Sequence, residues 1–325
     1  MRYRRFRRLR QLEGEWYTPR PIAVTELGGL ELDVVLLCTL REAAALSSDR
    51  RILRDIDRPV FAPLKSYLDL TRNQVMVDEA TDFSPLQLAC MYALCTPGVK
   101  SFFACGDFNQ RVTNWGSRSD ADLEWAVPRI SIRPIAISYR HSKQLSDLAA
   151  KLIALAGGKE RPVQLPSDVN SDGVAPALAL GLGDPEAETA WLADRILEVE
   201  RYTSELPSVA VLVRREEDVI PLAARLKEKL EPFNVNVVPC TNGQVVGQEN
   251  DVRVFDVQHI KGLEFEAVFF VGIDELALTS PDLFDKYLYV GATRAATFLG
   301  LTCNGPALPP SIRDIEGDFT DGWHG

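Results

Sequence analysis

Residues 259–270 read HIKGLEFEAVFF, a polar turn with one glycine that leads directly into an almost continuous apolar run. Similar runs, rich in β-branched or aromatic residues and followed by polar or acidic residues, recur at 73–77, 99–105, 208–213, 252–257, 267–273 and 298–303. Near-continuous apolar strands are typical of a parallel sheet that is covered on both faces. The sequence therefore predicts an α/β fold, and we expect functional residues at the carboxyl ends of the strands.

Helical stretches separate these runs. Amphipathic spacing and flanking cap or stop residues predict helices at 143–156, 186–203 and 217–230. The region 162–185 is rich in proline, glycine, serine and aspartate, which predicts a loop. One strand–helix series ends near residue 130 and another begins, so we expect two domains, residues 1–130 and residues 131–325.

The composition is that of a globular protein, with 46% hydrophobic and 25% charged residues among 325. No apolar run reaches the roughly 18 residues of a membrane span, and the basic amino terminus lacks the apolar stretch of a secretory signal. We therefore expect a cytoplasmic protein with no membrane partner. The six cysteines form no CxxC pair and lie near no histidine cluster, which predicts buried, reduced thiols.

The net charge of −10 is unfavourable for a general nucleic-acid binder. Six arginines crowd the first ten residues, where they could contact phosphates or form a solvated helix face. Any contact with nucleic acid therefore has to come from a local groove and not from the overall charge.

The first segment with recognisable chemistry is VMVDEATD at residues 75–82, a hydrophobic strand that ends in two adjacent carboxylates. Adjacent side chains diverge, so Asp78 could hold Mg²⁺ through water while Glu79 orients or deprotonates an attacking water. An Asp-Glu pair alone is commonly a surface turn. Here FSPLQ follows at residues 83–87, which makes the segment more specific.

Further segments place polar turns beside apolar strands or helices. They are CGDFNQ at 105–110 with Trp115 behind it, ISYRHS at 137–142, KGLEF at 261–265 and YVGATRA at 289–295. Taken singly, Trp115 could be a core tryptophan, and an arginine after a strand could be a salt-bridge partner. Together with VMVDEATD they make five segments, and five in this order are not expected by chance.

Together these segments resemble the motifs of superfamily 1A DNA helicases of the UvrD, Rep and PcrA type. DEATD resembles the family's Walker B segment, GDFNQ its GDxxQ segment, and KGLEF and YVGATRA its motifs V and VI. The resemblance implies P-loop NTPase-type architecture with two RecA-like parallel-sheet lobes. Lobe 1A, residues 1–130, would be incomplete and carry motifs II and III. Lobe 2A, residues 131–325, would carry motifs IV to VI with a reduced or absent 2B insertion.

The resemblance also implies ATP and Mg²⁺ as cofactors. Asp78 takes the place of the Mg²⁺ ligand. Arg140 and Arg294 take the places of groups that spread positive charge over the transferred phosphoryl group. The implied catalytic residues are Glu79, Gln110, Arg140 and Arg294, and the implied nucleotide-binding residues are Asp78, Gly262 and Glu264.

Single-stranded or tailed DNA is the implied partner, with Trp115 stacking on a base and His259 and Lys261 in the turn that contacts the DNA backbone. The sequence departs from the family just before this turn. Asp256 and Gln258 stand where the family has threonine and histidine, and His259 is one position out of register. An acidic residue in place of a phosphate-facing hydroxyl weakens contact with DNA.

The chain lacks the G-x-x-x-x-G-K-[ST] loop whose amides and lysine cradle phosphates in such motors; GGKE at 157–160 has neither the spacing nor the hydroxyl. Three explanations stay open: the sequence is a fragment, the loop is lost, or another polypeptide supplies it. We therefore predict a truncated or degenerate helicase or translocase module. The alternative is a non-catalytic helicase-fold scaffold or nucleic-acid-binding subunit, beside a nuclease or in a repair or anti-phage defence complex.

Overall fold

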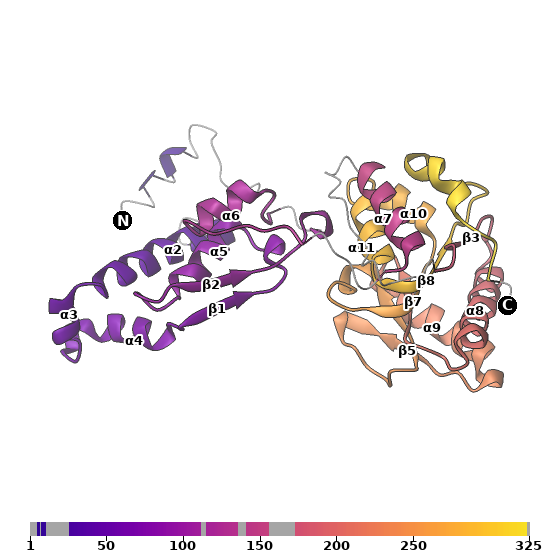
Figure 1. Cartoon of the computed structure of the whole chain (residues 1–325), viewed down its shortest axis with the longest axis horizontal. Coiled ribbons are helices and arrows are strands. Elements are labelled where there is room, and N and C mark those ends of the chain that lie inside the picture. The colour runs from indigo at the N-terminus through magenta and orange to yellow at the C-terminus, as the bar shows by residue number, and fades with distance from the viewer. Residues whose placement is uncertain are drawn as a thin grey trace. The chain divides into compact units, whose positions relative to one another are not determined.

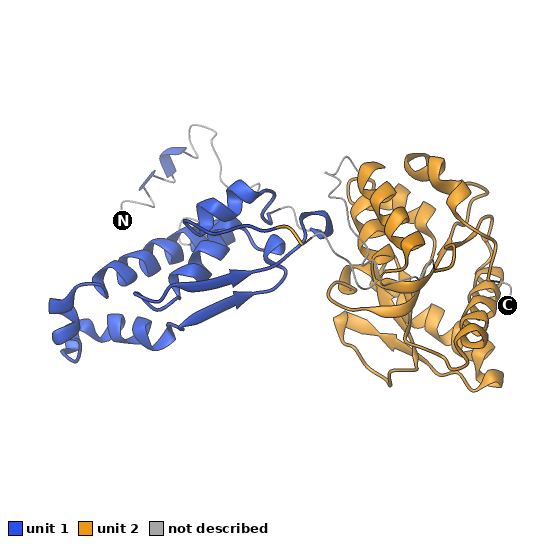
Figure 2. Ribbon diagram, in the orientation of Figure 1, with its two compact units in different colours: residues 1–133 blue, residues 134–325 orange. Residues whose placement is uncertain are grey.

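The computed structural model describes residues 5, 6, 8–10, 26–111, 115–135, 141–155 and 173–323. The chain divides into two compact units, residues 1–133 and residues 134–325 (Figure 2). Each unit contains a parallel sheet with helices packed against it (Figure 1). Within the described part of the chain, none of the helices has the length and apolarity needed to cross a membrane.

Unit 1 is built around a two-stranded parallel sheet, β1-β2, whose helices lie on one side (Figure 1). Its elements are α2 (Gly29–Leu46), α3 (Arg50–Arg54), η1 (Pro59–Phe61), α4 (Ala62–Leu70), β1 (Gln74–Val77), η2 (Ala80–Asp82), α5 (Pro85–Ala93), β2 (Ser101–Ala104), η3 (Phe108–Gln110) and α6 (Asp120–Ala126). Val75, Val77 and Phe102 join the core cluster that α2, α4 and α5 form. This helical layer holds the two strands in place.

The other face of this sheet is exposed. Met76 and Phe103 are register partners on β1 and β2, and they are 68% and 52% exposed. Successive side chains point to opposite faces of a strand, and here the described helices cover one face. The prediction that all the apolar runs are covered on both faces is therefore wrong for β1 and β2.

Unit 2 contains a six-stranded parallel sheet in the order β3-β8-β7-β4-β6-β5. Its elements are α7 (Lys143–Leu155), β3 (Ala177–Ala179), α8 (Pro185–Thr203), β4 (Val209–Val213), α9 (Glu216–Leu230), η4 (Glu231–Phe233), β5 (Val237–Cys240), η5 (Thr241–Gly243), β6 (Val252–Asp256), η6 (Val257–His259), β7 (Phe265–Phe270), α10 (Ile273–Thr279), α11 (Phe284–Ala292), β8 (Ala295–Thr302) and η7 (Pro310–Asp318).

Helices cover both faces of this second sheet. Phe269 packs edge-on against Trp191 of α8, with ring centroids 6.3 Å apart. The next residue, Phe270, faces α11, where a Cβ on Gly291 would lie only 2.9 Å from its ring. The alternation confirms the predicted α/β fold with a covered parallel sheet.

Most predicted elements of unit 2 are confirmed. The helices at 143–156, 186–203 and 217–230 correspond to α7, α8 and α9, and Ser142 caps α7 by accepting a hydrogen bond from Leu145 N at 3.4 Å. The predicted loop at 162–185 is wrong at its end, because it contains the three residues of β3. Strand β5 was not predicted.

The cysteines largely follow the prediction. All six are free thiols, and four of them are buried. Burial raises the pKa of the Cys303 thiol to about 12. Cys38 is exposed and Cys105 is half-buried, so the prediction of burial fails at these two positions.

Candidate functional site

The acid pair of unit 1 lies where β1 leaves the core. Val77 is buried, Asp78 is exposed and Glu79 is half-buried. Glu79 adopts a left-handed backbone conformation, with φ 50° and ψ 41°, which is uncommon for a residue with a side chain and is often found at functional sites. Its N–H donates to Asp78 Oδ1 at 2.9 Å, so one backbone turn positions both acids.

The turn after β2 is bonded to the turn after β1. Ala80 N donates to Cys105 O at 2.8 Å, and Cys105 N donates to Val77 O at 3.0 Å. The Thr81 hydroxyl donates to Asp107 O at 3.0 Å. Thr81 therefore ties the DEATD segment to the GDFNQ segment.

Gln110 and Trp115 follow the second of these turns. Asp107 caps the short helix η3 by accepting a hydrogen bond from Asn109 N at 2.8 Å, and Gln110 ends that helix. Trp115 is 60% exposed, as a residue that stacks on a base must be. Gln110 thus lies at the same sheet edge as the acid pair.

In unit 2, three of the predicted segments meet at the amino-terminal edge of the sheet. Glu264 immediately precedes β7, and Arg294 immediately precedes β8. Phe265 N donates to Arg294 O at 3.0 Å, and His141 Nε2 lies 3.0 Å from Thr293 O. Glu264 and Arg294, both predicted to contact the nucleotide, therefore lie at the amino ends of β7 and β8 and not at the carboxyl ends where we expected functional residues.

The two predicted phosphate-contacting arginines differ in what the structure describes. Arg294 is 3% exposed, and its Nε donates to Val290 O at 3.1 Å, so the end of α11 positions its guanidinium group. Arg140 lies outside the described residues. The contact of the neighbouring His141 with Thr293 places the described end of its segment beside YVGATRA.

The residues that depart from the helicase pattern lie at the opposite edge, after β6. Asp256 is 3% exposed, and its Oδ1 accepts a hydrogen bond from Gln258 N at 2.9 Å. Burial raises the pKa of the Asp256 carboxyl group. His259 Nε2 lies 3.8 Å from Glu216 Oε2. Sequence analysis missed Glu216, because only the pairing of β4 with β6 brings it here.

Lys261 and Gly262 lie in the short connection from the carboxyl end of β6 to the amino end of β7. Gly262 is exposed and has φ 79°, a backbone conformation that favours glycine. Lys261 is half-buried beside it. The turn takes the chain from the carboxyl end of β6 to the amino end of β7, so the KGLEF segment spans both edges.

The match to known proteins falls on this same stretch. Residues 251–302 match the model of the UvrD-like helicase C-terminal domain. This segment is UvrD-like. KGLEF and YVGATRA both lie inside it, so the match confirms the resemblance that they carry. The chain therefore contains a helicase-like module.

No curated protein matches the sequence. Among solved structures, the C-terminal domain of a possible DNA helicase from Lactobacillus plantarum WCFS1 is similar to 56% of this chain. The similarity covers 98% of that chain, at 21% sequence identity and a TM-score of 0.42.

The UvrD-like segment also borders a cavity of about 250 Å³ at the carboxyl edge of the sheet, lined in part by Glu188 and Gly272. The Thr302 hydroxyl donates to Glu188 Oε1 at 3.1 Å and accepts from Gly272 N at 2.9 Å. Burial raises the pKa of Glu188 to about 7. No sequence pattern singled out Glu188, because its burial arises from tertiary packing.

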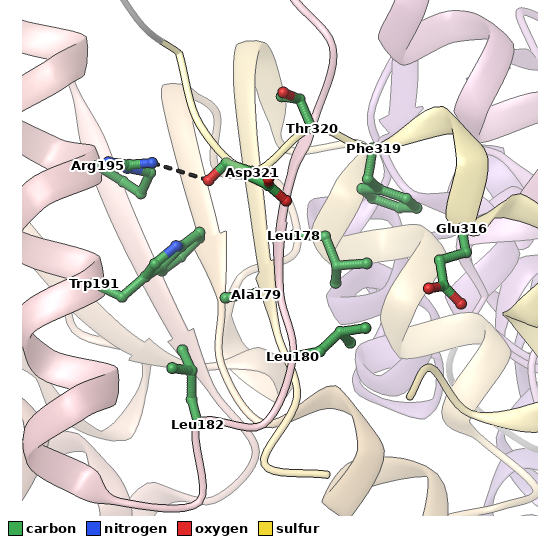
Figure 3. A pocket seen from close by; sticks show the side chains of 10 residues that line it. All are labelled: Leu178, Ala179, Leu180, Leu182, Trp191, Arg195, Glu316, Phe319, Thr320 and Asp321. Carbon is green, nitrogen blue, oxygen red and sulfur yellow. Dashed lines mark hydrogen bonds between the residues drawn. The ribbon is translucent and has the colours of Figure 1, made fainter. Parts of the chain in front are cut away.

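A larger cavity, of about 560 Å³, lies beside the edge strand β3 (Figure 3). Leu178, Trp191 and Phe319 line it, and Arg195 Nη1 donates to Asp321 O at 2.9 Å along one side. Its described lining contains none of the residues predicted for function, and we assign it no role.

We predict that Gly106→Ala destabilises unit 1. A Cβ at this position would lie 3.0 Å from Ala80 N and 3.1 Å from Thr81 N, which are backbone atoms of the acid turn. Overpacking of this kind costs roughly 1–3 kcal/mol, measurable by urea denaturation. The control Gly29→Ala adds a Cβ that meets nothing within 4 Å. Equal stability of the two variants would contradict the close packing of the turns.

The raised pKa of Glu188 predicts a pH-dependent stability. Between the ordinary glutamate pKa of 4.5 and the raised pKa of about 7, the folded state keeps a proton that the unfolded state has released, so stability falls as pH rises through this window. Glu188→Gln removes the penalty, which is at most roughly 3 kcal/mol.

We expect Glu188→Gln to melt at a higher temperature than the parent at about pH 8, and the gap to shrink toward about pH 5. Glu186→Gln on the same helix is the control, since Glu186 is exposed and pairs with Lys229 at 3.5 Å. A gap that does not change with pH would show that Glu188 titrates normally.

Proposed function

We propose that this chain is a UvrD-like ATP-dependent DNA helicase or translocase module, which couples ATP hydrolysis to movement along single-stranded DNA when a P-loop complements it. The observation that carries the proposal is the bonding of the DEATD turn to the CGD turn at one edge of the unit 1 sheet. These two segments are the ones expected to bind and sense phosphate. The UvrD-like match of residues 251–302 supports the same assignment from the other unit.

In this proposal, Asp78 and Glu79 carry the hydrolytic chemistry. Mg²⁺ is held in such sites by one or two carboxylates together with phosphates and waters, and the exposed Asp78 carboxylate at a strand end fits that donor set. The ion would supply charge neutralisation for the ATP phosphates. Glu79, positioned by the same backbone turn, acts as the general base toward the attacking water.

The other residues that we assign to nucleotide contact lie in both units, Gln110 in unit 1 and Arg140, Gly262, Glu264 and Arg294 in unit 2. Gln110 follows the turn that Thr81 ties to the acid pair, so a change at the phosphate can reach η3 through one hydrogen bond. The adjacency of Glu264 and Arg294, through Phe265 N and Arg294 O, supports a shared role for them in nucleotide contact. We assign the same class of role to Arg140 and Gly262.

Contact with single-stranded DNA is assigned to three exposed or half-buried side chains, Trp115, His259 and Lys261. An exposed indole ring stacks on any base and so suits a protein that moves along DNA. The chain's net charge of −10 makes these local contacts, and not the overall field, the source of affinity.

A second candidate is a non-catalytic subunit of a larger complex, such as one that contains a nuclease in repair or anti-phage defence. The exposed apolar pair Met76 and Phe103 favours it, because adjacent exposed apolar side chains often mark an interaction surface.

We predict that Trp115→Ala weakens binding to a fluorescein-labelled oligothymidine by roughly fivefold to a hundredfold, the effect of about 1–3 kcal/mol of base stacking. Fluorescence anisotropy measures the change. The control is Trp125→Ala, since Trp125 is 51% exposed in the same unit but packs under Arg41 at 5.8 Å. Equal losses in the two variants, or none, would remove Trp115 from the DNA site.

We predict different ATPase activities for the chain alone and for the chain mixed with a partner. The chain alone should bind ATP weakly and unwind no DNA, because the loop amides and lysine that offset triphosphate charge are absent from it. Mixed with a P-loop-bearing protein encoded beside it, it should gain DNA-stimulated ATPase activity.

In that mixture, Glu79→Gln should lower the rate at least roughly 100-fold, as the loss of a general base does. The exposed Glu124 supplies the control, Glu124→Gln. Robust activity of the chain alone would contradict the first arm, and no activity in any mixture would favour the non-catalytic subunit.

A further inference from the structure

We propose that Glu216, Asp256 and His259 form a binding site for a divalent transition-metal ion in unit 2. Each residue offers one ligand atom, and these three atoms all lie within 4.8 Å of one another. They come from three successive points of the carboxyl edge: the start of α9, the end of β6 and the short helix η6. The proposal does not depend on the proposed ATPase or DNA functions.

The donor set indicates the class of ion. One imidazole and two carboxylates suit zinc and its neighbours in the first transition row, whereas magnesium and calcium prefer oxygen donors alone. Tetrahedral coordination at zinc distances places ligand atoms about 3.4 Å apart. Glu216 Oε2 and His259 Nε2 are 3.8 Å apart, and no two of the three ligand atoms are more than 4.8 Å apart, so the site has to contract by at most about 1.4 Å between any two atoms.

The surroundings position these side chains in advance. Asn242 N donates to Glu216 Oε1 at 2.7 Å, which leaves Oε2 directed toward His259. A Cβ on Gly243 would lie 3.3 Å from His259 Nδ1, so this glycine lets the η5 turn approach the imidazole ring closely. The η5 turn therefore bonds Glu216 as the outer shell of a metal site does, and it lies beside the His259 ring.

An ion pair alone explains this cluster poorly. Glu216 Oε2 is buried and has no hydrogen-bond partner among the described residues. The distance of 3.8 Å to His259 exceeds that of a hydrogen bond, and the buried Asp256 adds a second negative charge. A dication would satisfy the buried oxygen and balance both carboxylates.

The site would remain open to a further ligand. The side chains of His259 and Glu216 are 40% and 36% exposed, so the fourth position of a tetrahedral ion would face solvent. An open position on a dication accepts water or an anionic oxygen. If the proposed DNA function holds, such an ion would also offset the repulsion between Asp256 and a DNA phosphate.

The test measures metal binding directly, without ATP or DNA. Chelator-treated full-length chain with Cys38→Ser, which removes the exposed thiol as a competing ligand, is titrated with Zn²⁺ by calorimetry. Co²⁺ is the spectroscopic probe, since its visible bands report coordination geometry. We expect one ion per chain, and at least tenfold weaker binding in Glu216→Gln, Asp256→Asn and His259→Gln.

Glu217→Gln is the matched control, because Glu217 neighbours Glu216 but pairs with Arg215 at 2.6 Å. It should bind the ion like the parent, and circular dichroism should show that all variants are folded. No saturable binding below millimolar Zn²⁺, or equal affinity in the parent and His259→Gln, would overturn the proposal. Failure of the DNA or ATPase assays would leave it intact, and its own failure would leave the proposed function intact.

Discussion

Unit 2 depends on a central strand that is buried along its whole length. The residues of β4, Val209–Val213, are all buried, and the strand pairs with β6 on one side and β7 on the other. The N–H and C=O groups of a buried strand must find partners in neighbouring strands, and helices cover both faces. The side chains of β4 itself are therefore all apolar, and the acids and arginine discussed above lie at the two edges where strands begin and end.

These two edges carry different chemistry, and a single segment connects them. Asp256 ends β6 and His259 follows it at the carboxyl edge, whereas Glu264 and Arg294 precede β7 and β8 at the amino edge. The six residues of β7 separate the edges by roughly 20 Å, at about 3.3 Å per residue. The KGLEF turn thus crosses the unit, and residues only eight positions apart in the sequence, Asp256 and Glu264, belong to different sites.

The local sequence predicted most helices and strands, but it did not predict which side chains are exposed or at which end of the sheet they lie. The helices at 186–203 and 217–230 were predictable because amphipathic spacing is a local property. Strand β3 was not, since three apolar residues in a proline-rich stretch give no period. The exposure of Met76 and Phe103 depends on how many layers cover the sheet, which periodicity does not encode. Sequence resemblance assigned roles to Glu264 and Arg294 but could not say at which edge they lie.

The two acids that sequence analysis missed, Glu188 and Glu216, share one physical problem with Asp256: each has a carboxylate oxygen that is withdrawn from solvent at the carboxyl edge. A buried charge must be neutralised by a proton or by a partner. Glu188 takes the first solution, since burial raises its pKa to about 7 and Thr302 hydrogen-bonds its oxygen. Glu216 and Asp256 lie too close together for each to be treated alone, and the adjacent imidazole makes a shared cation the simpler solution. Glu188 of α8 meets Thr302 at the end of β8, and Glu216, which follows β4, meets Asp256 at the end of β6, so the assembly of the parallel sheet brings both acids to its carboxyl edge.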